Sequence, residues 1–193
     1  MKMDFIRKQI EESLNVKKLL LDDIYIQKSI KESSDICCKA IKNGNKILFI
    51  GNGGSAADAQ HLAGELVNRF GFERPGLSAI ALTTDTSVIT SIANDYGFEK
   101  VFSRQVQAVG IKGDVLLALS TSGNSANILE GINEAHNRGI TTIGLTGLKG
   151  GKMSGLCDLC IKVPTDDTPR IQEAHILIGH IICSMIENII FGK

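Results

Sequence analysis

A histidine and a glutamate that could do chemistry together lie four residues apart, at His61 and Glu65. Residues at that spacing share one face of an α-helix, so a helix here would present both side chains to the same ligand. An imidazole and a carboxylate can bind a divalent metal ion or transfer protons. Taken singly, each could equally be an exposed or hydrogen-bonded structural residue, so the surrounding sequence has to decide.

A strand, a glycine turn and a helix over residues 46–68 are expected to position this pair. Residues 46–50 are mostly apolar and predict a buried parallel strand, which runs into Gly51-Asn52-Gly53-Gly54-Ser55. A helix is expected from Ser55 or Ala56 to about Asn68. The free N–H groups at its start and the positive end of its dipole favour an anion, usually a phosphate.

Two nucleotide motifs resemble this turn but do not fit it. Gly51 to Ala56 follows the dinucleotide pattern G-x-G-x-x-A, but the next strand ends in Leu82-Thr83-Thr84 and lacks the acidic residue that holds the ribose. No Gly-Lys-Ser/Thr closes the turn, which excludes a P-loop. No nucleotide cofactor is therefore expected.

A second turn repeats the first. The apolar residues 114–120 lead into Thr121-Ser122-Gly123-Asn124-Ser125, and a helix is expected to follow. Hydroxyl and backbone N–H donors at a helix start can hold a phosphate monoester without basic residues. A turn that only needed an N-cap would require one serine. We therefore predict that this turn binds phosphate.

The remaining chain predicts a single α/β domain. Two helices are expected within residues 3–43, the second from about Ile24 to Lys42, and the first could pack either on a partner subunit or on its own domain. A turn is expected at Asn94–Gly97, a helix over 98–109, and a last helix from about Pro169 to Ile190. Because strands alternate with helices, the sheet should be parallel and covered on both faces. The expected strands are residues 46–50, 77–82, 114–120, 141–147 and 159–164.

Composition excludes several partner classes. Lys and Arg together number 21, as do Asp and Glu, so the net charge is zero and no basic field is available for nucleic acid or an anionic membrane. No signal peptide or apolar run of about 18 residues is apparent, so a cytoplasmic protein without a membrane partner is expected. The five cysteines, Cys157-x-x-Cys160 among them, are expected to be free thiols.

The last helix supplies further candidates, Gln172 and His180. His180 lies among apolar neighbours and therefore needs a polar partner. His175 is about 140° from His180 around the helix, so the two cannot face one site.

Taken together, these motifs resemble the sugar isomerase (SIS) domain family over essentially the whole chain. The stretches that carry the resemblance are GNGGSAADAQHLAGEL (51–66), ANDYGF (93–98), FSRQV (102–106), STSGNSANI (120–128), GGKM (150–153) and RIQEAHILIGH (170–180). The serine and threonine turn alone would indicate only a phosphosugar binder, whereas its combination with H-x-x-x-E and the last motif is much more specific.

The resemblance implies a single SIS domain over residues 1–193, with helices in 1–43 for oligomer packing, and a cytoplasmic homotetramer whose sites are shared between subunits. It implies conversion of sedoheptulose 7-phosphate to D-glycero-D-manno-heptose 7-phosphate for lipopolysaccharide or other surface glycans. The phosphate would be held by Ser120, Thr121, Ser122 and Ser125. The implied sugar contacts are Asn52, Gly53, Ser55, Glu65, Arg69, Asn94, Asp95 and Gln172. The implied zinc ligands are His61, Glu65, Gln172 and His180, and the implied base and acid are Glu65 and His180.

An aldose–ketose isomerase needs a base for a carbon-bound proton and an acid for the oxygen proton, which a carboxylate and an imidazole supply without redox chemistry. The alternative is a non-catalytic SIS adaptor that binds a replication initiator and differs at the acid and base. Glu65 and His180 are both present, which favours the enzyme. A phosphosugar-sensing regulator of the wider family would need an attached DNA-binding domain.

Overall fold

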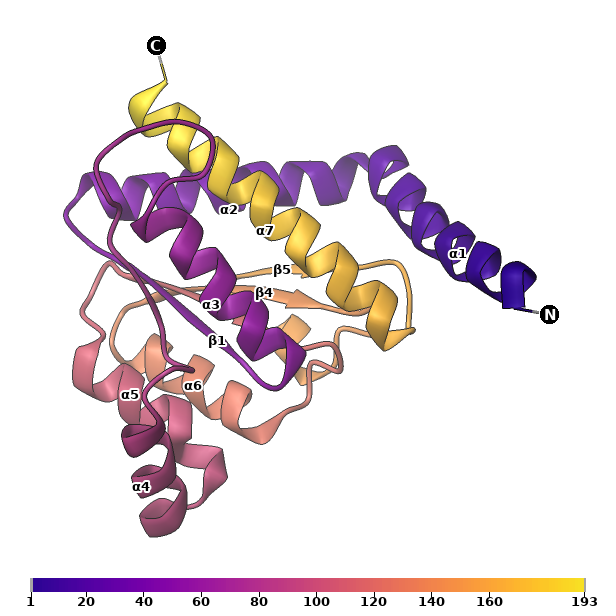
Figure 1. The fold of residues 1–193 in the computed structure, drawn as a ribbon. Coiled ribbons are helices and arrows are strands. Elements are labelled where there is room, and N and C mark those ends of the chain that lie inside the picture. The colour runs from indigo at the N-terminus through magenta and orange to yellow at the C-terminus, as the bar shows by residue number, and fades with distance from the viewer. Residues whose placement is uncertain (1, 193) are drawn as a thin grey trace.

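The computed structural model describes residues 2–192 and has an α/β fold, as predicted. Its five strands form one sheet in the order β2-β1-β3-β4-β5, with every pair parallel (Figure 1). The central strands are buried on both faces, which explains their unbroken apolar sequences. The strands are β1 (Ile47–Gly51), β2 (Ala79–Ala81), β3 (Val115–Leu119), β4 (Thr141–Thr146) and β5 (Leu159–Lys162).

Alternate side chains of β1 enter two separate cores. In the first core, Ile47 and Phe49 pack with α2, α3 and α7 on one face of the sheet. In the second core, Leu48 and Ile50 pack with α5 and α6 on the other face. Figure 1 shows these helices on opposite sides of the sheet. The helices are α1 (Lys2–Asp22), α2 (Ile24–Lys42), α3 (Gly54–Val67), α4 (Thr86–Tyr96), α5 (Val101–Val109), α6 (Ala126–Asn137) and α7 (Thr168–Phe191).

A buried carboxylate fixes the starts of β1 and β3, the two strands that end in the polar turns. Asp114 Oδ1 accepts a hydrogen bond from the Lys46 backbone N–H at 3.0 Å, and Oδ2 accepts one from Ile111 N–H at 2.9 Å. Lys46 Nζ lies 2.7 Å from Asp114 Oδ2. These contacts align the two strands, so the two turns emerge side by side at the opposite edge of the sheet.

Helix α1 extends away from the body of the molecule (Figure 1). Its apolar stripe faces outward, with Phe5, Ile6, Ile10 and Leu14 each at least half exposed. Both expected arrangements therefore apply to parts of this helix: Val16 and Leu20 near its end are buried against its own domain, whereas the first half of the stripe is left open for a partner.

The prediction of a turn at Asn94–Gly97 is wrong. Helix α4 continues through Asn94 and Asp95 to Tyr96, and only Gly97, at φ 93°, ends it. Glycine adopts such a positive φ without steric cost, so the chain can leave the helix at this residue. The helix expected over 98–109 is divided into a 3₁₀ turn, Phe98–Lys100, and α5.

Helix α7 is, within the described residues, the one helix long and apolar enough to cross a membrane by length and composition. This finding corrects the expectation that no apolar segment of the chain is as long as a membrane-spanning helix. Because α7 packs against α2 and α3 in the first core, its composition also fits the central helix of a folded domain.

Candidate functional site

The first turn leads from β1 into α3, and its residues leave the helix start open to a ligand. Helix α3 begins at Gly54, and no side chain caps it. Ala56 N–H and Ala57 N–H both donate to the Gly53 carbonyl, which tightens the turn. A Cβ on Gly51 would collide with the Ser55 carbonyl, so glycine is required where the strand passes into the helix.

The second turn, Ser120–Ser125, joins β3 to α6 and is held by its own hydroxyl groups. Ser120 Oγ accepts a hydrogen bond from Gly123 N–H at 3.2 Å and lies 3.4 Å from Ser125 Oγ. Gly123 has φ +64°, and a Cβ there would collide with the Gly150 carbonyl. Ser122 is exposed at the tip of the turn, where it can meet a ligand.

A pair of amides joins the two turns. Asn52 Nδ2 donates to Asn127 Oδ1 and Asn127 Nδ2 donates to Asn52 Oδ1, both at 2.8 Å. Asn127 is buried at the start of α6 and was missed by the sequence reasoning, since only the fold brings it beside Asn52. The pair fixes the spacing between the turns, which lie at the carboxyl edge of neighbouring strands where parallel sheets bind ligands.

His61, Glu65 and His180 form a compact triad between α3 and α7. One ligand atom from each lies within 4.8 Å of the others. His61 Nε2 is 3.0 Å from Glu65 Oε1 and 3.0 Å from His180 Nε2. His180 thus has the polar partner that its apolar neighbours required. Two imidazoles and one carboxylate form a donor set that catalytic zinc sites use, so these residues fit a divalent metal ion.

Gln172 lies about two helical turns before His180 on α7, roughly 12 Å along the axis. Its side chain packs against the start of α3, where a Cβ on Gly54 would be 2.5 Å from Gln172 Nε2. Gln172 therefore contacts the first turn, and three of the four expected metal ligands are brought together beyond it.

Asp58 is a further carboxylate near the triad. Burial raises the pKa of the Asp58 carboxyl, and the nearby His61 and His180 side chains oppose that rise. Its Oδ2 is buried without a hydrogen-bond partner among the described residues. Sequence reasoning missed Asp58, although its spacing of three and seven residues from His61 and Glu65 places all three on one helix face.

The remaining expected sugar contacts are Arg69, Asn94 and Asp95. Arg69 is exposed beyond the end of α3, 3.8 Å from Glu73 Oε2. Asn94 and Asp95 lie at the end of α4, whose apolar residues pack in the second core, on the opposite side of the sheet from α3 and α7 (Figure 1). Within one chain, the structure does not bring Asn94 and Asp95 to the expected site.

A small cavity of about 140 Å³ adjoins the first turn, lined by Asn52, Gly53, Thr83 and Phe98 among others. Larger cavities of about 340 and 490 Å³ lie between α2 and β5 and beside the loop at Phe72–Pro75. These two are not lined by residues of the triad or of either turn, so the polar turns and the triad remain the candidate site.

Comparison with known proteins gives one consistent family. The SIS domain model matches residues 16–147. The phosphoheptose isomerase of Aneurinibacillus thermoaerophilus is 55% identical over 97% of this chain and 95% of its own length. Phosphoheptose isomerase 2 of Campylobacter jejuni is 58% identical over 98% of this chain and 94% of its own length. The solved phosphoheptose isomerase structure from Neisseria gonorrhoeae has a TM-score of 0.91 and 42% identity, covering 97% of this chain and 100% of that one.

Proposed function

The chain belongs to the SIS domain family, and we infer that it is an aldose–ketose isomerase that converts sedoheptulose 7-phosphate to D-glycero-D-manno-heptose 7-phosphate. The observation that carries this function is the meeting of Glu65 and His180 in one triad from separate helices. A carboxylate and an imidazole in reach of one substrate are the groups this reaction needs. The product would supply heptose units for lipopolysaccharide or other surface glycans.

The substrate phosphate is held by the second turn, through the hydroxyls of Ser120, Thr121, Ser122 and Ser125. The sugar lies toward the first turn, within reach of Asn52, Gly53, Ser55 and Gln172. Since Asn52 Oδ1 and one of its N–H groups already bind Asn127, Asn52 contacts the sugar through its second N–H or its backbone.

Glu65 removes a proton from C1 of the ketose, and the electron pair of that C–H bond forms the C1=C2 double bond of an enediol. His180 donates a proton to O2 as the carbonyl bond opens. In the second half, the O1 proton returns to His180 while Glu65 delivers its proton to C2. Atoms and charges balance without an oxidant, because one proton moves between carbons and another between oxygens.

A zinc ion held by His61, Glu65 and His180 would polarise the carbonyl and stabilise the developing enediolate. Gln172, the fourth expected ligand, packs against Gly54 and would have to leave that position to reach the metal. Glu65 cannot bind the metal tightly and act as a free base at once. Glu65 would therefore act as the base only when its carboxylate is not coordinated to the metal, and otherwise the metal would have a structural role.

Substitution of His61 by alanine is expected to weaken zinc binding at least tenfold, because one of the three converging ligand atoms is lost. Competition with a chromogenic chelator measures this affinity without reference to turnover. His136→Ala is the matched control, since His136 is exposed near the end of α6 and bonds Thr142 instead. Equal zinc affinity in His61→Ala and wild type would remove His61 from the metal site.

We further propose a cytoplasmic homotetramer in which the exposed apolar stripe of α1 packs on a partner subunit and Asn94 and Asp95 reach a neighbouring subunit's site. Light scattering is expected to give about four times the 20.8 kDa chain mass. Ile10→Glu places a charge in the stripe and should lower that mass, whereas Glu11→Gln, on the polar face, should not. An active wild-type monomer would contradict shared sites.

Incubation with sedoheptulose 7-phosphate, followed by NMR, tests the function directly. Appearance of a new aldose phosphate is the expected result. If the sugar phosphate raises the melting temperature but is not converted, the protein is a phosphosugar-binding adaptor of the same family and the isomerase proposal fails.

A further inference from the structure

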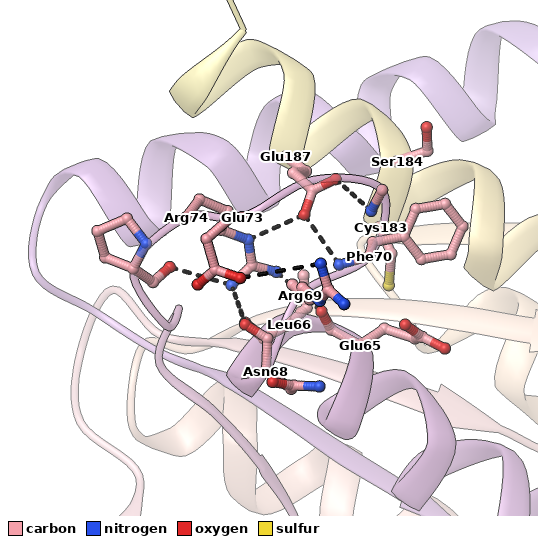
Figure 2. A network of polar contacts seen from close by, with 12 residues as sticks. Glu65, Leu66, Asn68, Arg69, Phe70, Glu73, Arg74, Cys183, Ser184 and Glu187 are labelled. Carbon is pink, nitrogen blue, oxygen red and sulfur yellow. Dashed lines mark hydrogen bonds and ion pairs between the residues drawn. The ribbon is translucent and has the colours of Figure 1, made fainter.

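A buried ion pair links the loop after α3 to the last part of α7. Arg74 Nε donates to Glu187 Oε1 at 3.0 Å, and each side chain is only 1% exposed (Figure 2). Burying two charges is costly, and apolar residues of similar size often stabilise a fold equally well. The pair is therefore better explained by the geometry that it fixes than by stability alone.

Arg74 holds the carboxyl end of the helix that carries Glu65. Its Nη2 donates to the Glu65 carbonyl at 2.8 Å, and Nη1 donates to the Leu66 and Asn68 carbonyls at 2.6 and 3.1 Å. The last carbonyls of a helix lack partners within that helix. One guanidinium thus fixes the backbone of α3 at and just after Glu65, as Figure 2 shows.

Glu187 holds the residue that packs against His180. Its Oε1 accepts from Phe70 N–H at 2.9 Å, and its Oε2 accepts from Gly71 N–H at 2.6 Å. The Phe70 ring lies 5.6 Å from the His180 imidazole, centroid to centroid, at 49°. Burial alone would raise the pKa of Glu187, but these N–H donors and Arg74 outweigh it and lower the pKa, so Glu187 is ionised at neutral pH.

We propose that Arg74 and Glu187 are positioning residues that set the placement of Glu65 relative to His180. Arg74 acts through the backbone of α3, and Glu187 acts through Phe70, while neither side chain takes part in the triad. The inference rests on the roles proposed above for Glu65 and His180.

The decisive variant is the double substitution Arg74→Met with Glu187→Leu. It removes both buried charges together, so no lone charge is left to unfold the protein, but it abolishes the bonds to α3 and Phe70. We expect kcat to fall about tenfold, as for other groups that orient catalytic residues, with KM changed less than twofold because the phosphate turn is untouched. Removal of an exposed pair, Lys100→Met with Glu130→Leu, is the matched control and should leave both values unchanged.

A spectroscopic readout separates this proposal from the proposed function. The Phe70 ring should shift the NMR signals of the His180 imidazole protons, and Phe70→Leu gives the value without the ring. In the double variant the signals should move toward the Phe70→Leu value, whether or not the protein turns over a sugar. Wild-type shifts together with a kcat within twofold of wild type would overturn the positioning role. If the wild-type protein does not convert the sugar phosphate but the His180 signal moves in the double variant, the isomerase proposal fails and the positioning proposal stands.

Discussion

Replacing Glu65 by glutamine is expected to lower kcat by a factor of about 10² to 10⁴ while the protein remains folded. The substitution keeps the size of the side chain and its place on α3 but removes the group that accepts the carbon-bound proton. Isomerisation of sedoheptulose 7-phosphate deuterated at both C1 positions adds a second measurement, because wild type should move deuterium from C1 to C2 and the variant should not.

The exposed carboxylate of Glu32 on α2 offers a matched control, since Glu32→Gln makes the same chemical change away from the site. Circular dichroism and the melting temperature establish that Glu65→Gln is folded. If its turnover stays within threefold of wild type, Glu65 is not the base, and Asp58, the other carboxylate near the imidazoles, becomes the next residue to test.

Ser122→Asp is expected to abolish binding of the sugar phosphate. The new carboxylate would stand at the exposed tip of the second turn, beside the phosphate. Two like charges about 4 Å apart repel by about 4 kcal/mol near a protein surface, which corresponds to about a thousandfold in Kd. Calorimetric titration with sedoheptulose 7-phosphate measures the change.

Ser122→Asn separates charge from volume, because asparagine has the size of aspartate but no charge. Its Kd should rise far less than that of Ser122→Asp. Equal affinities for wild type and Ser122→Asp would show that the phosphate binds elsewhere, and the helix start of α3 would then be the anion site to examine.

The strands and most helices could be predicted from sequence because each carries its own signal. The strands are unbroken apolar runs, and glycine or serine turns mark where α3 and α6 begin. The end of α4 was misjudged because Asn94 and Asp95 are frequent turn residues, whereas apolar packing of Ile89 and Ile92 keeps that segment helical. Local propensity is overridden by such contacts.

The difference between local sequence patterns and tertiary contacts also explains which residues of the site could be predicted. The two turns and the spacing of His61 and Glu65 are local patterns, so sequence finds them. Asn127 acts on a residue 75 positions away, and Arg74 pairs with a residue 113 positions away, so neither is visible before the chain is folded. His175 is fully buried, and burial lowers its pKa to about 4, while His180 sits at the partly open triad. The apolar neighbours of both histidines gave no sign of which one faces inward.

The strand order has a consequence for how the protein forms during synthesis. Strand β1 leaves the ribosome first but lies between β2 and β3, so one of its edges stays unpaired until residues 115–119 emerge. The triad cannot assemble until α7, the last helix made, packs beside α3. Nascent chains therefore carry an open β1 edge until β3 emerges, a state that favours aggregation and calls for chaperone protection.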